Sequence, residues 1–267
     1  MRSLVWSSVR NNSGRYIATF VAIITGVAFF TATGLIGARV VNSLEGDVDQ
    51  QYGNVDLAVV LQESDGGGLS VNPGRDLTIS AKSADRITSL PGVSGSAGEL
   101  SAPVAFEGPN GKPVGQATGR LWITDDKLNP IDVTKGRAPT RTGEVAIDRG
   151  TADARGLKVG ERTTLLTLAG PKPVTVVGIT RFGDNDALDQ SGTVSLPQDA
   201  AVAWLNRGQR EYQALYLRGA SQDQLLREVK PLVPAGYRAQ KGDAFLAAQR
   251  DSIGAIDNTY KYLGTQW

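Results

Sequence analysis

The chain has 267 residues with no cysteine and no histidine, and its 28 basic side chains nearly balance 27 acidic ones. The absence of cysteine excludes disulfides, thiol nucleophiles and Cys-ligated zinc. The absence of histidine excludes Ser-His-Asp and Cys-His catalysis and disfavours zinc or non-haem iron sites. We therefore expect no enzymatic activity, no catalytic residue, no cofactor and no metal site.

The charges are unevenly distributed along the chain. Residues 1–39 carry four basic and no acidic side chains, so the remainder has 24 basic and 27 acidic side chains, a net charge of −3. Nucleic-acid binding requires a basic surface. The sequence therefore predicts no nucleic-acid partner.

Residues 16–38, between Arg15 and Arg39, form a run of 23 residues without a charge. As a helix this run spans about 35 Å, enough to cross a hydrocarbon core of about 30 Å. A cleaved signal peptide is the alternative, but its apolar region is usually about 7–15 residues long and follows a short leader. The length favours a retained transmembrane helix, preceded by a cytoplasmic amphipathic segment at residues 1–15.

The basic residues before this run indicate its orientation. Arg2, Arg10 and Arg15 precede it with no acidic residue among them. Cytoplasmic flanks of membrane helices are enriched in Lys and Arg. We expect the N-terminus in the cytoplasm, the helix in the plasma membrane in contact with lipid, and the main domain outside the cytoplasm.

A stripe of small residues runs along the predicted transmembrane helix at four-residue spacing, interrupted by Phe30. Small residues let membrane helices approach each other closely. Their general abundance in membrane helices is the alternative explanation. The predicted packing residues are Ala18, Ala22, Gly26, Gly34 and Ala38.

The helical pattern continues beyond the apolar run. Val41, Leu44, Val48 and Tyr52 are spaced as one stripe of a helix, with acidic and amide side chains between them. We expect an outgoing stalk helix over residues 39–53.

A second stripe lies near the end of the sequence, at Ile253, Ile256, Tyr260 and Leu263. This spacing predicts either a returning stalk helix over residues 251–267, packed against the first stalk, or an amphipathic helix on the domain's own core. Because the sequence stops at this helix, we expect it to lead to a missing transmembrane helix of a longer protein.

Residues 54–250 show the mixed pattern of an extracytoplasmic α+β domain. A strand is predicted at 55–61, a helix capped by Ser80, and a hairpin at 101–118 around a Pro-Asn-Gly turn. Residues 143–157 predict a strand followed by a short helix that begins near Asp148 or Arg149.

A second hairpin is predicted at 158–180, with a Gly-Pro turn. Residues 211–233 predict a strand and a helix capped by Ser221, and Tyr237 begins a further strand. Strand-helix-strand units that flank a β-rich middle indicate two subdomains, the β-rich one inserted into the other.

Three motifs resemble known sites only weakly. Asp184, Asp186 and Asp189 could form a calcium loop, but Asp189 and Ser195 stand where an EF-hand needs Gly and Glu, so a solvated loop is favoured. The run "DGGGLS" lacks the Lys-Ser/Thr of a phosphate loop. The run "TDDKLNP" offers two adjacent carboxylates, Asp125 and Asp126, and is more typical of a turn.

The run "RGTADARGLKVGERTTLL", the later "GPKPVTVVGI" and "RFGDNDALDQSGTVSLPQDAA" resemble the extracytoplasmic domain of FtsX/MacB-type ABC transporter permeases, notably actinobacterial ones. The start, "SVRNNSGRYIATFVAIITGVAFFTAT", is similar to the family's cytoplasmic amphipathic segment and first transmembrane helix. The resemblance covers essentially the whole chain, which would be the N-terminal part of such a permease.

This resemblance implies a permease subunit that works with a dimeric cytoplasmic ATPase and a second permease copy or homologue. Such systems export or extract lipids, lipoproteins, peptides or drugs. The alternatives are a non-transporting mechanotransmission subunit that activates cell-wall hydrolases through an extracytoplasmic partner, and a single-pass anchored binding or assembly domain.

Overall fold

The computed structural model describes residue 25 and residues 46–62, 78–108, 110–183, 185, 186, 188 and 191–252. One compact unit, Asp47–Gln249, contains nearly all of these residues. Among the helices of the described residues, none combines the length and apolarity needed to cross a membrane. The predicted transmembrane helix at 16–38 lies outside the described residues except for position 25.

The first subdomain is built on a four-stranded sheet in the order β13-β1-β12-β3, and all its strand pairs are antiparallel. Along the chain, a helix follows β1 and precedes β3, and another lies between β12 and β13, as in the split βαβ fold of ferredoxin-like domains. The strands are β1 (Leu57–Leu61), β3 (Val93–Glu99), β12 (Ala214–Gly219) and β13 (Tyr237–Lys241).

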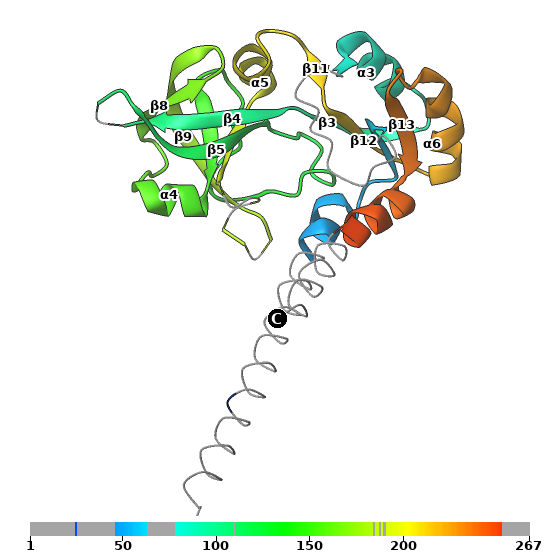
Figure 1. The fold of residues 1–267 in the computed structure, drawn as a ribbon, viewed down its shortest axis with the longest axis horizontal. Coiled ribbons are helices and arrows are strands. Elements are labelled where there is room, and N and C mark those ends of the chain that lie inside the picture. The colour runs from blue at the N-terminus through cyan, green and yellow to red at the C-terminus, as the bar shows by residue number, and fades with distance from the viewer. Residues whose placement is uncertain are drawn as a thin grey trace, which may run out of the picture. The chain divides into compact units, whose positions relative to one another are not determined.

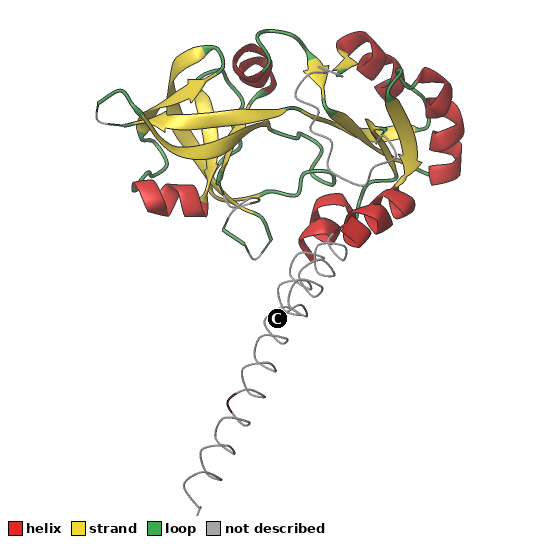
Figure 2. Cartoon of the chain, in the orientation of Figure 1, coloured by secondary structure: helices red, strands yellow, loops and turns green. Residues whose placement is uncertain are grey.

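Three helical elements contribute to the core on one face of this sheet (Figure 2): α3 (Ala81–Thr88), α6 (Gln222–Val229) and the 3-10 turn η1 (Lys230–Leu232). The hydroxyl oxygens of Ser80 and Ser221 accept hydrogen bonds from the backbone at the starts of α3 and α6, which confirms both predicted caps. Leu57 and Val59 join the cluster that includes the α3 and α6 side chains, whereas Ala58 belongs to a second cluster on the opposite face.

The second subdomain is a β-barrel inserted between β3 and β12 (Figure 1). Its strands run in the order β6-β9-β7-β10-β5-β4-β8, and an additional β8–β9 pairing closes the ring. The strands are β4 (Ser101–Glu107), β5 (Pro113–Leu121), β6 (Asp132–Gly136), β7 (Glu144–Asp148), β8 (Arg162–Thr167), β9 (Gly170–Arg181) and β10 (Thr193–Leu196).

Closure depends on the length of β9, which has 12 residues and pairs with β6, β7 and β8. A barrel leaves no free edge within its ring. Its core contains almost fully buried apolar side chains, among them Phe106, Ile147, Leu165 and Val194. The helices are α4 (Arg149–Arg155) and α5 (Gln198–Leu205).

The chain crosses between the subdomains twice. It enters the barrel at Leu100, between β3 and β4, and returns after α5 through the short strand β11 (Glu211–Tyr212), which pairs with β2 (Ile79–Ser80). The inserted arrangement predicted from the sequence is therefore confirmed, as are both hairpins and the strand-helix pairs.

Several elements differ from the sequence predictions. The first strand begins at Leu57 and not at 55, because the backbone N–H of Val55 donates to the Tyr52 carbonyl in a turn. The strands β3, β6 and β10 and helix α5 were not predicted. The sequence of β3, VSGSAGE, has only one β-branched residue, so propensity gives no strand signal there.

Candidate functional site

The two ends of the compact unit meet on the face of the four-stranded sheet opposite α3 and α6. Residues 47–52 and 242–249 are helical, and they lie side by side at this face (Figure 1). The Tyr52 ring packs edge-on against the Phe245 ring with centroids 5.0 Å apart, and Tyr216 of β12 lies 5.4 Å from Tyr52 and 6.0 Å from Phe245. These aromatic contacts join both ends of the compact unit to the sheet.

The sheet makes room for the three rings by presenting small side chains. Ala58, Ala97 and Ala214 are buried in the same cluster as Tyr216 and Phe245. Aromatic pairs at these separations contribute about 0.5–1.5 kcal/mol beyond the area they bury. The packing therefore fixes the position of the helical residues on the sheet.

The second helical segment is also fixed through its backbone. Gly242 donates its N–H to the carbonyl of Asp56 at 2.9 Å. A Cβ at Gly242 would lie 1.6 Å from the carbonyl oxygen of Val55, so only glycine permits this approach. The start of the segment is thereby held against the start of β1.

The helical residues 47–52 also contact the barrel. Gln50 donates from Nε2 to the carbonyl of Pro130 at 3.4 Å, and Asn185 donates from Nδ2 to Oδ1 of Asp47 at 2.7 Å. Pro130 precedes β6 and Asn185 follows β9, so both belong to the barrel subdomain. Burial raises the pKa of Asp47, and the hydrogen bond from Asn185 opposes this rise. A single helical turn therefore contacts both subdomains.

A buried ion pair lies close to the tyrosines at the first crossing between the subdomains. Glu99 is the last residue of β3, and Arg120 lies near the end of β5. The Nη2 atom of Arg120 is 3.3 Å from Oε2 of Glu99, and the Arg120 side chain is only 6% exposed. Burial raises the pKa of Tyr216 well above its ordinary value, and the negative charge of Glu99 adds to this rise. We call Tyr52, Tyr216, Phe245, Glu99 and Arg120 the coupling site.

A second ion pair connects the subdomains nearby. The Nη2 atom of Arg218, on β12, lies 3.1 Å from Oδ2 of Asp125, which follows β5. The Oδ1 atom of Asp125 accepts a hydrogen bond from the backbone N–H of Lys127, and the Leu128 N–H donates to the Asp125 carbonyl. The run "TDDKLNP" therefore forms a turn, as its sequence favoured. Asp125 forms an ion pair that connects the two subdomains.

Comparison with family models matches residues 16–232 to the MacB-like periplasmic core domain. The chain belongs to this family. The resemblance to MacB-type ABC transporter permeases predicted from the sequence is therefore confirmed, and a permease-type role follows for the chain. A search of curated proteins found no match.

Solved structures resemble this chain at low sequence identity. The periplasmic region of MacB from Actinobacillus actinomycetemcomitans superposes with a TM-score of 0.54 and 13% identity, covering 75% of this chain and 94% of that one. The extracellular domain of the noncanonic ABC-type transporter YknZ from Gram-positive bacteria gives a TM-score of 0.48 and 15% identity. The match covers 69% of this chain and 99% of that one. The mixed α/β fold of this MacB-like core domain agrees with that of the MacB periplasmic region.

Most packing residues predicted for the stalks of the MacB-like chain lie outside the described residues. Val48 is the exception, and it is helical and half-buried. The others stay predictions, as does the small-residue stripe: Ala18, Ala22, Gly26, Gly34, Ala38, Val41, Leu44, Ile253, Ile256, Tyr260 and Leu263.

Two of the weak motifs are partly or wholly outside the described residues. The run "DGGGLS" at 65–70 lies outside them, as do Asp184 and Asp189 of the possible calcium loop. The remaining acid of that loop, Asp186, pairs with Arg149 of α4 at 2.6 Å. In the described part of the chain, no group of three or more acidic side chains is placed to hold a metal ion.

Sequence reasoning found only part of the coupling site of this MacB-like domain. Tyr52 ended the helical stripe at residues 41–52, which was a usable signal. Tyr216, Phe245, Glu99 and Arg120 gave none, because their meeting depends on how β3, β5, β12 and the second helical segment come together in space.

Proposed function

We propose that this chain is the N-terminal part of an ABC transporter permease subunit that couples ATP hydrolysis in the cytoplasm to movement of the MacB-like domain outside the membrane. A separate dimeric ATPase hydrolyses ATP, and this chain itself catalyses no reaction. The movement serves export or extraction of a lipid, lipoprotein, peptide or drug.

The observation that carries this proposal is the double contact of the helical residues 47–52. They lie in the predicted outgoing stalk, residues 39–53, which follows the predicted transmembrane segment at 16–38 in the sequence. Tyr52 packs on the sheet of the first subdomain, while Asp47 and Gln50 bond to loops of the barrel. A displacement of this helix would therefore act on both subdomains at once.

The ion pairs support the same interpretation. Glu99–Arg120 connects the subdomains at their first crossing, and Arg218–Asp125 connects them farther along β3, where Arg218 lies opposite Gly95. A packed interface with few alternative arrangements tends to switch between discrete states and does not deform continuously. Movement of the helix can therefore change the angle between the subdomains.

The test measures a distance between the subdomains in the full-length permease, reconstituted with its ATPase in nanodiscs. The chain has no native cysteine, so spin labels can be placed at exposed Ala169 in the barrel and exposed Arg238 on β13. We expect the distance distribution to shift when ATP is bound and to return after hydrolysis.

The matched variants are Tyr52→Ala, which removes the ring, and Tyr52→Phe, which keeps it. We expect Tyr52→Ala to lose the ATP-dependent shift while the ATPase still turns over, and Tyr52→Phe to retain the shift. Melting curves of both variants show whether the domain is folded. A spin-label distance distribution that does not change when ATP binds to the unsubstituted protein would contradict the proposal.

A further inference from the structure

A cleft of about 510 Å³ opens between the two subdomains. One wall consists of α3 and β3 residues, including Ala84, Thr88 and the run 96–98. The other wall consists of residues 121–124, which follow β5, and residues 138–140, which follow β6. This volume is in the range of specific ligand sites.

The β3 wall is the edge of the four-stranded sheet. Among the described strands, β3 pairs with β12 alone, and it stands last in the sheet order. In an antiparallel edge strand, every second residue directs its N–H and C=O groups away from the sheet. The residues Ser96, Ala97 and Gly98, which line the cleft, therefore include backbone groups that a further strand could pair with.

The regular part of this edge, residues 96–98, carries none of the residues that usually protect an edge strand, and the bulge of β3 lies before it, at Ser94. β3 contains neither proline nor lysine, the residues that most often prevent pairing at an edge. Its side chains at 96–98 are small, so another backbone can approach closely. The Tyr212 ring lies so close to Gly98 that a Cβ there would be 2.4 Å from it, which keeps this part of the strand free of a side chain.

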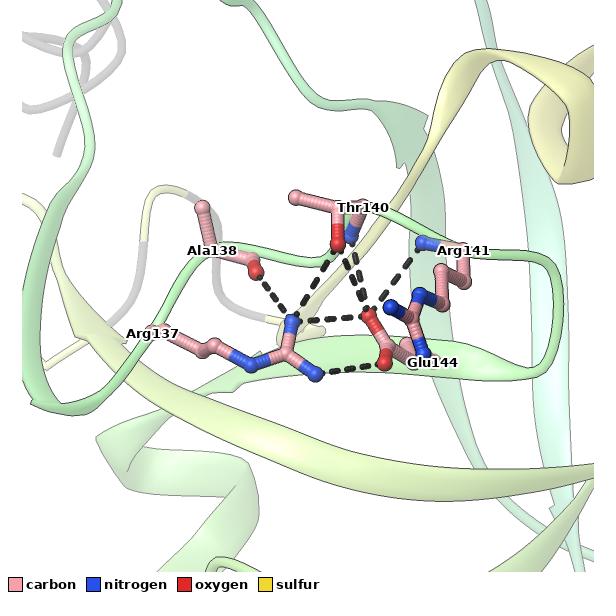
Figure 3. Close-up of polar contacts among 5 residues, drawn as sticks. All are labelled: Arg137, Ala138, Thr140, Arg141 and Glu144. Atoms are coloured by element: carbon pink, nitrogen blue, oxygen red, sulfur yellow. Dashed lines mark hydrogen bonds and ion pairs between the residues drawn. The ribbon is translucent and has the colours of Figure 1, made fainter.

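The opposite wall is held in place by a clamp between Arg137 and Glu144 (Figure 3). The Arg137 guanidinium donates from Nη1 and Nη2 to the two carboxylate oxygens of Glu144, and from Nη1 to the carbonyl of Ala138. Glu144 also accepts from the backbone N–H groups of Thr140 and Arg141. The clamp fixes the loop that brings 138–140 to the cleft.

The cleft is lined by uncharged groups apart from one carboxylate. That carboxylate, Asp85, is already paired with Arg210 at 2.5 Å. The remaining polar side chains are hydroxyls, one amide and the indole of Trp122, among them Thr88, Thr124, Thr140 and Gln198. A charged ligand would therefore find no opposite charge among the lining residues except the carboxylate of Asp85, which Arg210 already pairs, whereas an uncharged one meets no repulsion.

We propose that this cleft binds an extended, uncharged polypeptide segment, which pairs with the free edge of β3 as an added strand. The N–H and C=O groups that the described strands leave unpaired along β3 are complementary to another polypeptide backbone, and alternate side chains of the segment face the two walls. Binding of this kind requires neither ATP nor movement of the helical residues 47–52, so it can hold or fail independently of the proposed coupling.

The probe is a fluorescein-labelled peptide of sequence STVTVTVTS with blocked ends, which is uncharged and favours the extended conformation. Fluorescence anisotropy with the full chain in detergent should show saturable binding. N-methylation of the three valines removes the N–H groups of one edge of the peptide, and N-methylation of the threonines removes those of the other edge. We expect one of the two methylated peptides to bind at least tenfold more weakly and the other to bind as the parent does.

The matched protein variants are Ser96→Lys and Ser94→Lys. Both residues lie on β3, but Ser94 lies at the bulge near the start of the strand and only Ser96 lines the cleft. We expect Ser96→Lys to weaken binding at least tenfold and Ser94→Lys to leave it within twofold, with both proteins melting at similar temperatures.

Three outcomes would overturn the proposal. The parent peptide shows no saturable binding, the two methylated peptides bind equally, or Ser94→Lys and Ser96→Lys weaken binding to the same degree. Saturable binding of an uncharged oligosaccharide that displaces the peptide and is lost in Ser96→Lys would reassign the cleft to glycans.

Discussion

The ring of Tyr52 meets the ring of Phe245 edge-on, at a centroid distance of 5.0 Å and an interplanar angle of 81°. The two residues stand at opposite ends of the compact unit, separated in sequence by both subdomains. Because Tyr216 of β12 contacts both rings, the aromatic cluster determines how the first and last helical residues of the domain are held on its sheet.

Truncation of Phe245 tests the importance of this cluster for stability. Phe245 is 4% exposed, and Phe→Ala substitutions at buried sites typically cost about 3–5 kcal/mol. We expect Phe245→Ala to reduce the free energy of unfolding by this amount in chemical denaturation, and Phe245→Leu by less. Leu168→Ala is the control, because Leu168 is 57% exposed and should change stability by less than about 0.5 kcal/mol. Equal losses at the two positions would contradict the packing described.

Gly242 offers an independent test of the same junction through the backbone. A side chain there has no space beside the Val55 carbonyl, so the strand and the helical segment must separate to accept one. We expect Gly242→Ala to destabilise the domain by about 1–3 kcal/mol, the usual cost of overpacking. Thermal melting measures the stability of this variant. Ala247→Ser, at an exposed position of the same helical segment, is the control and should leave the melting temperature nearly unchanged.

The sequence predicted the fold better than the site. Ser80, Asp148 and Ser221 each precede a helical pattern, and all three cap the helices expected from them. These signals are local, since a cap bonds to the backbone within three residues. The inserted topology was also predictable, because the strand-helix pattern is interrupted by hairpins.

The site depended on contacts that local patterns do not encode. Glu99 and Arg120 are ends of strands in different subdomains, and nothing in their neighbours marks them as partners. The strand β3 was missed for a related reason. Its glycines are required by the side chains opposite, namely Asp125 and Arg218 against Gly95 and the Tyr212 ring against Gly98, while glycine lowers strand propensity.

The clamp between Arg137 and Glu144 predicts a pH dependence of stability. Hydrogen bonds from Arg137, reinforced by the backbone N–H of Thr140, lower the pKa of Glu144 from 4.5 to about 2. Because the folded state holds this proton less tightly than the unfolded state, the stabilisation is complete above about pH 4.5 and is lost as the pH falls towards 2. We expect the Glu144→Gln variant to be less stable than the unsubstituted protein at pH 7. At pH 3 the difference in stability between the two proteins should be smaller.

Arg137→Gln is the matched variant for this experiment, since it removes the cation and keeps the carboxylate. Unfolding by urea at pH 7, 5, 4 and 3 gives the measurement for each protein. If Glu144→Gln and the unsubstituted protein lose stability in parallel down to pH 3, the clamp does not lower the pKa of Glu144 as described.

The last prediction concerns the ion pair at the crossing between the subdomains. The Arg120 side chain is 6% exposed and that of Glu99 is 21% exposed, so removing one partner leaves a charge in a poorly solvated place. Loss of one partner of a buried pair typically costs about 3–5 kcal/mol, whereas replacing both by apolar residues is often nearly neutral. We expect Glu99→Leu and Arg120→Met each to destabilise the domain, and the double variant to lose less than the sum of the two.

The double-mutant cycle should therefore yield a coupling energy within the range of about 0.5–3 kcal/mol found for residues in direct contact. The exposed pair Asp85–Arg210 provides the matched control, because its side chains are 57% and 39% exposed and such pairs contribute about 0–1 kcal/mol. Raising the salt concentration should weaken the control pair and leave the Glu99–Arg120 coupling nearly unchanged, since buried charges are screened less. A Glu99–Arg120 coupling no larger than the control, or one abolished by salt, would mean that this pair is solvated and does not hold the subdomains together.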